Sequence, residues 1–374
     1  MKRVATLFIL LAICASAPVF AEDELSAKLA SIKLPPGFEI RVYAEGVENA
    51  RQLALGDHGT VFVGSRKAGL VHAVVDRDGD HLADRVYLID KDLKMPSGLE
   101  FRFSSLYVAA LDRILRYDDV ENWLDQPPEP VVVTDQFPDK THHGWKYLRF
   151  GPDDLLYVPV GAPCNICEEP GFAQIRRVLA DGSGMEEYAE GVRNSVGLTF
   201  HPETKELWFT DNGRDLMGDD IPGDELNHAS KAGMHFGYPF CHQGDTPDPE
   251  FGQGKSCTDY TTPALTLGAH VAALGLTFYT GGMFPDEYRN QLFIAQHGSW
   301  NRSEKVGYDI LLVRFDAGGR VTGSEAFASG WLQGQDNWGR PNDVLQMPDG
   351  SLLVSDDQAG AIYRIVWTGQ ADGQ

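Results

Sequence analysis

A hairpin pattern that returns six times is the feature that most constrains how this chain of 374 residues folds. Each copy consists of a short apolar strand, a turn and a second apolar strand. The copies occupy residues 53–63, 99–109, 148–158, 198–209, 276–295 and 344–354. The first four are spaced by roughly 45–50 residues, a period typical of propeller blades or solenoid repeats.

More strand-like sequence follows each hairpin, and this favours an all-β fold, a six-bladed β-propeller, over a helical solenoid. A pair of β-sandwiches is the alternative, but it does not predict the regular spacing. Residues 38–43 alternate between apolar and polar and would pair with 361–365, which closes the ring. We therefore predict a propeller over residues 38–367, an N-terminal extension at 22–37 and a tail at 368–374.

The N-terminus has the pattern of a cleaved secretion signal at residues 1–21. Lys2 and Arg3 precede an apolar run at 6–14, and small residues end the segment at 19–21. The apolar run is too short for a membrane span, and no later segment approaches about 18 uninterrupted apolar residues. We expect an exported protein, periplasmic or secreted, with no membrane span.

The formal net charge of the chain is −22. Charge of this sign argues against nucleic acid and anionic membranes as partners. A solvated acidic surface accounts for most of it, although clustered acids also offer oxygen ligands for a hard cation.

Four cysteines remain once Cys14 leaves with the signal. An even number in an oxidising compartment favours two disulfides. Sequence proximity favours Cys164–Cys167 and Cys241–Cys257, although three connectivities are open. A site with four thiolates on zinc is the alternative.

One acidic segment has the spacing of a calcium loop. Its carboxylates stand at positions one, three, five and nine, and they belong to Asp76, Asp78, Asp80 and Asp84. Such spacing can wrap oxygens around Ca2+, but the bidentate Glu expected at position twelve is missing. A plain acidic hairpin tip is the alternative, and a metal here would be structural.

Polar residues stand directly before three of the repeated hairpins. His143 precedes the third copy, Arg193 and Asn194 precede the fourth, and Arg340 precedes the sixth. On a propeller, this position opens onto the same end of the central channel in every blade. We therefore expect His143, Arg193 and Arg340 to converge, although a brace between blades is the alternative role for Arg193.

Two further segments follow the second strand of a hairpin. Asn212 and Gly213 form a turn that exposes backbone carbonyls, and acids lie shortly after it. Carbonyls with nearby acids make a site for a hard cation. Residues 296–302 follow the fifth copy and would place His297, Trp300 and Arg302 near the channel or its rim.

Several of these motifs occur in an order that resembles the soluble pyrroloquinoline quinone (PQQ)-dependent sugar dehydrogenases, including the sorbosone dehydrogenase branch. The similarity runs from about residue 38 to residue 365. The motifs are His143 eight residues before Gly151-Pro152-Asp153, Arg193-Asn194 with Gly197-Leu198, Asn212-Gly213 with 224–227 and 237–239, and Gly339-Arg340 with Asp343-Val344.

The resemblance implies that PQQ lies across the mouth of the channel. The residue matching His143 would be the general base, which removes the hydroxyl proton of the sugar as hydride passes to the quinone. The residues matching Arg193, Asn194 and Asn212 would contact the cofactor, with Arg193 stabilising charge on the quinone oxygens. Arg340 would pair with a cofactor carboxylate.

The same resemblance implies a Ca2+ ion beside the quinone. The carbonyls of Gly213 and Arg214 would bind this ion, which acts as a Lewis acid. Asp224 would orient Arg193 or the shell of the metal. Arg302 is a candidate for a lysine that helps to bind the quinone in the glucose enzymes.

The chain also departs from the family pattern. Ala162 stands where the family commonly has an acid that supports the base, so the sequence offers nothing that orients His143. Asn342 replaces a second arginine, and Arg214 replaces a proline. These differences argue against glucose specificity.

The sequence therefore predicts an exported, Ca2+- and PQQ-dependent dehydrogenase of an aldose or a sugar aldehyde. Electrons would pass to a separate periplasmic acceptor, such as a cytochrome or a quinone, because Glu168 rather than His follows Cys164-Asn165-Ile166-Cys167. The alternatives are a calcium-dependent propeller lactonase and a propeller that binds a ligand without catalysis.

Overall fold

The computed structural model describes residues 24–369 of the chain. The predicted secretion signal at 1–21 lies outside the described residues, as do residues 370–374 of the predicted tail.

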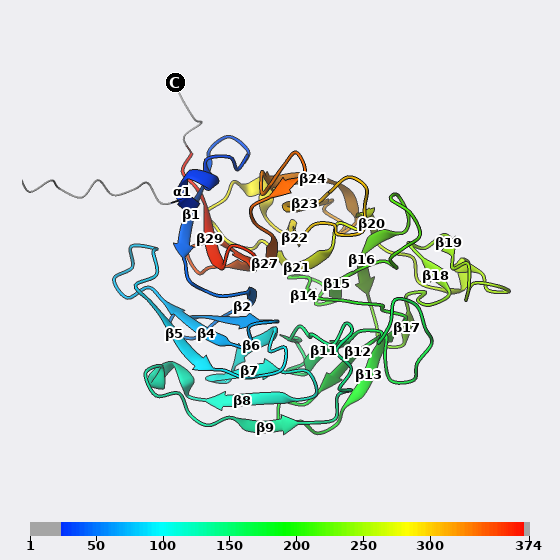
Figure 1. The fold of residues 1–374 in the computed structure, drawn as a ribbon, viewed down its shortest axis with the longest axis horizontal. Coiled ribbons are helices and arrows are strands. Elements are labelled where there is room, and N and C mark those ends of the chain that lie inside the picture. Colours follow the sequence, from blue (N-terminus) through cyan, green and yellow to red (C-terminus); the bar gives the residue numbers. More distant parts are fainter. Residues whose placement is uncertain (1–23, 370–374) are drawn as a thin grey trace, which may run out of the picture.

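Six β-sheets follow one another around a centre, in chain order, to form a six-bladed β-propeller (Figure 1). The first three blades are β2 (Ala50–Leu55), β3 (Val61–Ser65), β4 (Val71–Val75) and β5 (Arg85–Asp90); β6 (Gly98–Arg102), β7 (Ser105–Ala109), β8 (Ile114–Asp118) and β9 (Val131–Thr134); and β10 (Arg149–Phe150), β11 (Leu156–Val160), β12 (Gln174–Val178) and β13 (Glu186–Glu190). The last three are β14 (Leu198–Phe200), β15 (Leu207–Asp211), β16 (Gly223–Ala229) and β20 (Leu265–Ala269); β21 (Ala273–Phe278), β22 (Leu292–Gln296), β23 (Asp309–Phe315) and β24 (Val321–Ser329); and β27 (Pro341–Gln346), β28 (Leu352–Asp356), β29 (Ala361–Trp367) and β1 (Phe38–Ala44).

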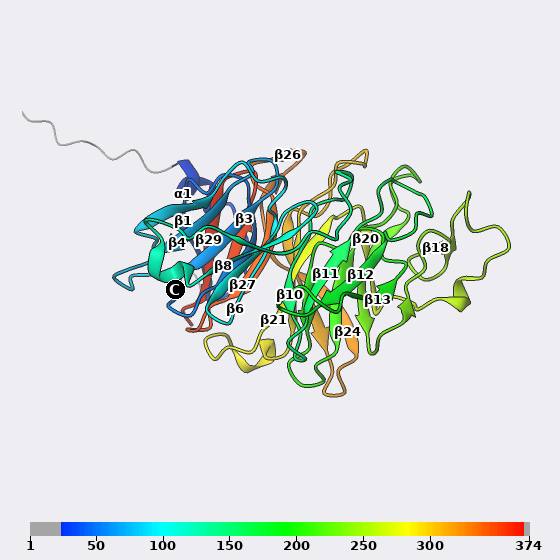
Figure 2. The ribbon, with the colours of Figure 1, turned by 90° about the horizontal axis from the view of Figure 1, so that it is seen from below.

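Short elements lie outside the blades. They are α1 (Glu24–Leu29), the 3-10 turns η1 (Val120–Trp123), η2 (Cys257–Asp259) and η3 (Asp286–Tyr288), the hairpins β18 (Cys241–His242) with β19 (Thr246–Pro247) and β25 (Leu332–Gln333) with β26 (Asp336–Asn337), and β17 (Met234–His235), which extends the third blade. The β18–β19 segment projects from the body of the molecule (Figure 2). No helix among the described residues is long and apolar enough to cross a membrane.

The six predicted hairpins are the first two strands of the six blades. Every residue of each second strand is buried, from β3 in the first blade to β28 in the last. These strands are apolar on both faces because a neighbouring blade covers each side. The outer strand β24 is instead largely exposed. Burial on both faces therefore explains why the repeat was visible in the sequence.

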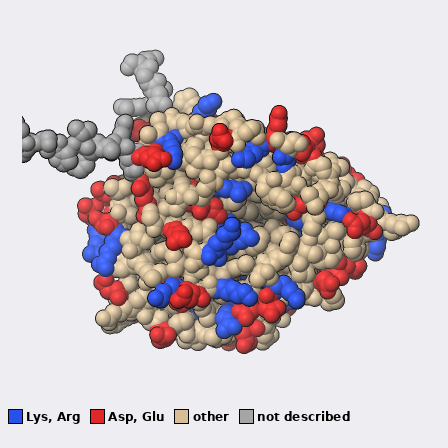
Figure 3. All heavy atoms as spheres, viewed as in Figure 1, with Lys and Arg blue, Asp and Glu red and all other residues tan. Residues whose placement is uncertain are grey.

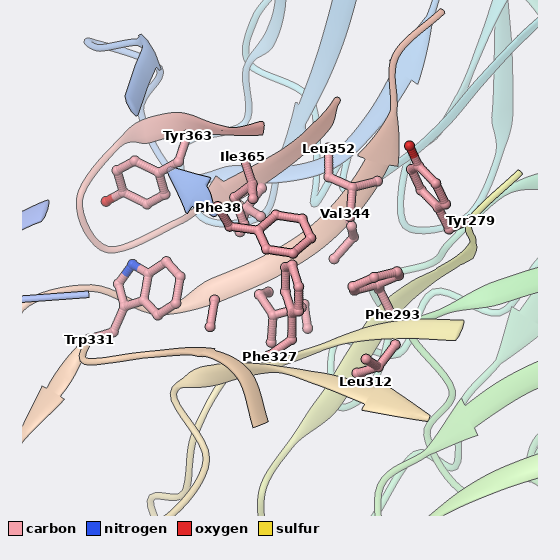
Figure 4. Close-up of a cluster of buried hydrophobic side chains, with 14 of the residues drawn as sticks. Phe38, Tyr279, Phe293, Leu312, Phe327, Trp331, Val344, Leu352, Tyr363 and Ile365 are labelled. Carbon is pink, nitrogen blue, oxygen red and sulfur yellow. The ribbon is translucent and has the colours of Figure 1, made fainter. Parts of the chain in front are cut away.

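The ring closes through the N-terminal strand, as predicted. β1 pairs antiparallel with β29, and Phe38 lies opposite Trp367. The Phe38 ring packs edge-on against Phe284, Phe327 and Trp367 with ring centroids 4.7–4.9 Å apart. These side chains belong to the largest apolar cluster, between the last two blades (Figure 4). One aromatic residue thus joins the two ends of the propeller.

The two disulfides pair as sequence proximity predicted. Cys164 is bonded to Cys167, and Cys241 is bonded to Cys257. The alternative of four thiolates on zinc is therefore wrong, because the sulfur atoms are bonded to each other. Disulfides of this kind are typical of an oxidising compartment.

Replacement of Phe38 by Ala tests whether this side chain stabilises the closed propeller ring. We expect a loss of about 3–5 kcal/mol in the free energy of unfolding, because a buried aromatic side chain leaves a cavity. Urea unfolding followed by tryptophan fluorescence measures this loss. Phe103→Ala is the matched control, since Phe103 is 56% exposed; an equal loss in both variants would contradict a closing role for Phe38.

Candidate active site

A cavity of about 560 Å3 lies where the predicted site loops meet. Most of its walls come from segments that precede the first strand of a blade and segments that follow the second strand, while Arg51, Asp224 and Leu274 lie within strands. His143, Arg193 and Arg340 all line it, so the structure brings together the three residues that the sequence placed at one end of the channel. Asn194, Asn212, Gly213 and Asp224 line it as well.

His143 is oriented by a backbone carbonyl. Its Nδ1 atom lies 2.9 Å from the carbonyl oxygen of Ala162. A carbonyl oxygen only accepts hydrogen bonds, so Nδ1 carries the proton and Nε2 is left as the acceptor of the ring. The residue that replaces the expected acid therefore still supports the histidine, through its main chain.

The Ala162 main chain also reaches the neighbouring blade. Its N–H donates to the carbonyl oxygen of Arg193 at 2.8 Å. The preceding Gly161 permits this close approach, because a Cβ at that position would lie 2.7 Å from the Cβ of His143. One peptide segment thus connects the predicted base to the predicted arginine.

The surroundings of His143 keep its ring neutral. The side chain is buried, and burial is the main reason why its pKa lies well below the usual value. The Arg193 guanidinium and His142 lower the pKa further. At neutral pH the ring is therefore unprotonated and able to accept a proton.

Arg193 is held by four hydrogen bonds from its guanidinium. Nε and Nη2 donate to the carbonyl and side-chain oxygens of Asn165 at 2.9 and 2.8 Å. Nη2 also pairs with the Asp215 carboxylate at 3.0 Å, and Nη1 donates to the carbonyl of Asn212 at 3.0 Å. A guanidinium has five N–H groups, so one on Nη1 remains without a partner among the described residues.

A buried carboxylate fixes the main chain of the same segment. Asp211, the last residue of β15, accepts the backbone N–H groups of Arg193 and Asn194 at 2.8 and 2.6 Å. Burial raises the pKa of Asp211 to about 7. This one side chain therefore holds both backbone N–H groups of the Arg193-Asn194 pair.

Two arginines at the cavity have no carboxylate partner among the described residues. The Arg340 guanidinium donates to the carbonyl oxygens of His297 and Gly298. The Arg66 guanidinium lies 3.5 Å from the centre of the Trp145 ring, and its buried Nε has no hydrogen-bond partner. Burial lowers the pKa of Arg66 to about 10, which still leaves it charged at neutral pH.

Positive charge therefore gathers in this part of an acidic protein. Figure 3 shows a hollow near the middle of one face, with Lys and Arg side chains beside it. Arg51 also lines the cavity, but its charge is balanced by Asp357 at 2.7 Å. The unbalanced cations, Arg66 and Arg340, suit an anionic ligand.

The residues predicted to bind Ca2+ place two carbonyl oxygens and one carboxylate close to the same turn. The carbonyl oxygens of Gly213 and Arg214 accept no hydrogen bond from the described residues. Asp224 accepts the backbone N–H groups of Gly213 and Ala273, so its carboxylate lies beside this turn. Burial raises the pKa of Asp224 to about 6, and a cation at this position would favour its ionised form.

The structure also shows what three of the predicted side chains contact. Asp215 rather than Asp224 contacts the Arg193 guanidinium, so of the two roles predicted for Asp224 the one beside the metal stays a prediction. The Arg214 side chain pairs with Asp248 and Glu250. Arg302 does not line the cavity, because its guanidinium is engaged by the main chain of Asp219 and Glu304 and by Asp220.

The acidic hairpin tip between β4 and β5 is separate from the cavity. Carboxylate oxygens of Asp76, Asp78 and Asp84 lie within 4.8 Å of one another, and two of these residues are exposed. The side chain of Asp80 is not part of this group; it accepts the backbone N–H of Leu82. Calcium binding here stays a prediction.

Sequence reasoning missed three residues that line the cavity, Arg66, Trp145 and Asp215, and it missed Asn165, which contacts Arg193. Arg66, Asn165 and Asp215 follow the second strand of their blades, and Trp145 lies just after His143. The second strand of a blade ends where the first begins, so its exit loop reaches the same end of the channel. This topological rule was the signal that could have found Arg66, Asn165 and Asp215, whereas Trp145 lies before the first strand of its blade, beside His143.

The neutral state of His143 has a measurable consequence. We expect its ring to stay unprotonated at pH 6.5, where a free histidine is half protonated. Below pH 6.5 the histidine is protonated in the unfolded chain but not in the folded protein. The contribution of His143 to the free energy of unfolding therefore falls as the pH drops below 6.5. 15N NMR of the imidazole nitrogens, with His143→Gln to assign the signal, measures the titration; a midpoint at or above 6.5 would contradict it.

Comparison with known proteins places this architecture in a family. Residues 32–368 match a family model described as TrAA12-like. An uncharacterized protein of Borreliella burgdorferi is 31% identical, over 98% of this chain and 97% of its own length. A PQQ-dependent pyranose dehydrogenase of Coprinopsis cinerea is 23% identical over 88% of this chain; the chain spans about half of that protein, 54% of its length.

Solved structures agree on the fold. A Trichoderma reesei structure of Carbohydrate-Active Enzymes Family AA12 has a TM-score of 0.77 at 22% identity, over 90% of this chain and 97% of that chain. The holo form of the pyranose dehydrogenase PQQ domain from Coprinopsis cinerea has a TM-score of 0.76 at 20% identity, with the same coverage. The match of the family model over nearly the whole propeller shows that the chain belongs to the TrAA12-like family.

Proposed function

We propose that this protein is an exported quinoprotein that oxidises an aldose or a sugar aldehyde, such as a sorbosone-like substrate, by hydride transfer to PQQ. One observation carries the proposal: a neutral, buried His143 shares a cavity with two arginines that lack carboxylate partners. Relatives named as PQQ-dependent sugar dehydrogenases support the choice of cofactor and of substrate class.

PQQ fits the donors that this cavity offers. It is a planar anion with several carboxylates, and guanidinium groups bind carboxylates in a planar, two-pronged geometry. Arg66 and Arg340 would hold these carboxylates, while the free N–H of Arg193 and the side chain of Asn194 would contact other cofactor oxygens. When bound, PQQ supplies a quinone that accepts hydride.

The protein itself would supply the base. His143 would take the hydroxyl proton of the sugar on Nε2, while Nδ1–H stays bonded to Ala162. The hydrogen bond to Ala162 stabilises the protonated ring, whereas burial and Arg193 disfavour it. Negative charge bound in the cavity would raise the pKa of His143 toward the working pH.

A Ca2+ ion beside the cofactor is part of the proposal. The carbonyls of Gly213 and Arg214, together with Asp224, would hold it, and its role would be to polarise the quinone. Electrons would leave to a separate acceptor in the periplasm, such as a cytochrome or a quinone.

Cofactor binding tests the roles of the two unpaired arginines. We expect Arg340→Gln and Arg66→Gln each to weaken PQQ binding about tenfold or more, because each removes a charge-assisted hydrogen bond. Fluorescence titration of the apoprotein with PQQ in the presence of Ca2+ measures Kd. Arg302→Gln is the matched control, since Arg302 lies outside the cavity, and equal weakening in all three variants would argue against a specific role.

Replacement of His143 separates binding from chemistry. His143→Ala should keep PQQ binding but lose about 10²–10⁴-fold in sugar-dependent dye reduction, the usual contribution of a general base. His58→Ala is a matched control because the His58 side chain is 65% exposed. Normal turnover by His143→Ala would rule out the base assignment.

Purified protein assayed with and without PQQ distinguishes the dehydrogenase from two alternatives, a calcium-dependent lactonase and a propeller that binds a ligand without catalysis. A calcium-dependent lactonase would hydrolyse sugar lactones without any quinone. A binding module would take up its ligand without turnover under either condition. Either result, with the fold intact, would replace the dehydrogenase proposal.

A further inference from the structure

A small disulfide loop touches the site although the proposed chemistry does not use it. The loop follows β11 and is closed by the bond between Cys164 and Cys167. Both cysteines are partly exposed. Between them stands Asn165, which makes the contacts described next.

Asn165 binds the Arg193 guanidinium with two different oxygens. Its main-chain oxygen accepts from Nε at 2.9 Å, and its side-chain oxygen accepts from Nη2 at 2.8 Å. The same side chain also joins Asp215, accepting its backbone N–H at 2.9 Å and donating to its carbonyl at 3.0 Å. Asn165 therefore fixes both Arg193 and the carboxylate-bearing residue that pairs with it.

The loop is held from its other side by a tyrosine. The backbone N–H of Cys167 donates to the hydroxyl of Tyr238 at 3.0 Å, and the Cys164 sulfur lies 3.6 Å from the same hydroxyl. Tyr238 is buried, and its backbone N–H donates to the carbonyl of Gly191, two residues before Arg193. The disulfide and Tyr238 together leave Asn165 little freedom to move.

We propose that Asn165 is a positioning residue for Arg193, and that the Cys164–Cys167 disulfide keeps it in place. The guanidinium forms two of its four hydrogen bonds with this single residue. Loss of either Asn165 or the disulfide loosens Arg193, so the site is sensitive to thiol reductants. The consequence for the cofactor rests on the proposed function; the effect on Arg193 does not.

The redox step is a simple exchange. An added dithiol gives two electrons and two protons to the bridge, so that the S–S bond breaks and S–H groups form on Cys164 and Cys167. The dithiol closes to its own cyclic disulfide. Partial exposure of both cysteines allows the attacking thiolate to approach.

Chemical modification measures the state of Arg193 without any cofactor. Phenylglyoxal reacts with free guanidinium groups, and peptide mass spectrometry gives the rate at Arg193. Asn165→Ala removes the side-chain oxygen that accepts from Nη2 but keeps the main-chain oxygen that accepts from Nε. We therefore expect this rate to rise about tenfold, the factor that corresponds to losing one hydrogen bond to a charged group. Asn165→Asp keeps an acceptor oxygen and should stay close to the wild-type rate.

The disulfide is tested with a matched pair. Cys164→Ser/Cys167→Ser should resemble Asn165→Ala, whereas Cys241→Ser/Cys257→Ser should leave the Arg193 rate near that of the wild type. In the second variant the Cys164–Cys167 bond is the remaining disulfide among the described residues, so added dithiothreitol should then raise the rate. Circular dichroism confirms that each variant is folded.

PQQ titration of the same variants gives the functional readout. We expect Kd to weaken about tenfold in Asn165→Ala and to recover in Asn165→Asp. Unchanged Arg193 reactivity in both Asn165→Ala and Cys164→Ser/Cys167→Ser would overturn the positioning role. A faster reaction at Arg193 in a protein that never binds PQQ would support the positioning role and overturn the proposed function.

Discussion

The pairing of β1 with β29 is the constraint on which the rest of the molecule depends. Most of the cavity wall comes from loops between strands, and the strands on either side fix where each loop begins and ends. Their positions are set by the blades, and the blades hold a fixed arrangement only when the ring is closed. The buried side chain of Phe38, on β1, stabilises the closed ring by packing among the aromatic residues of the last two blades.

Main-chain groups position several of the functional side chains in the cavity. Ala162 accepts from His143 with its carbonyl and donates to Arg193 with its N–H. Arg340 is likewise held by carbonyl oxygens, which restrain a guanidinium without neutralising it. Main-chain carbonyls of Asn165 and Asn212 also hold Arg193, beside its ion pair with Asp215. The cavity thus keeps positive charge for a ligand while its side chains stay ordered.

The fold was predictable because its cause is local. Strands buried on both faces read as apolar runs, and six such hairpins imply six blades. The convergence of His143, Arg193 and Arg340 followed from topology. Contacts made by the main chain were not predictable, since any residue at position 162 offers the same carbonyl. The direction of a long side chain also depends on neighbours distant in sequence, which is why neither the place of Arg66 in the cavity wall nor that of Arg302 outside it was foreseen.

A single-turnover experiment measures whether a sugar passes hydride to PQQ bound in this protein. Purified apoprotein is loaded with PQQ and Ca2+, excess cofactor is removed, and an aldose or a sugar aldehyde is added without an electron acceptor. We predict that the absorbance of the bound quinone changes to that of its reduced form, in proportion to the protein present. A protein that retains no quinone, or a bound quinone that no sugar reduces, would contradict it.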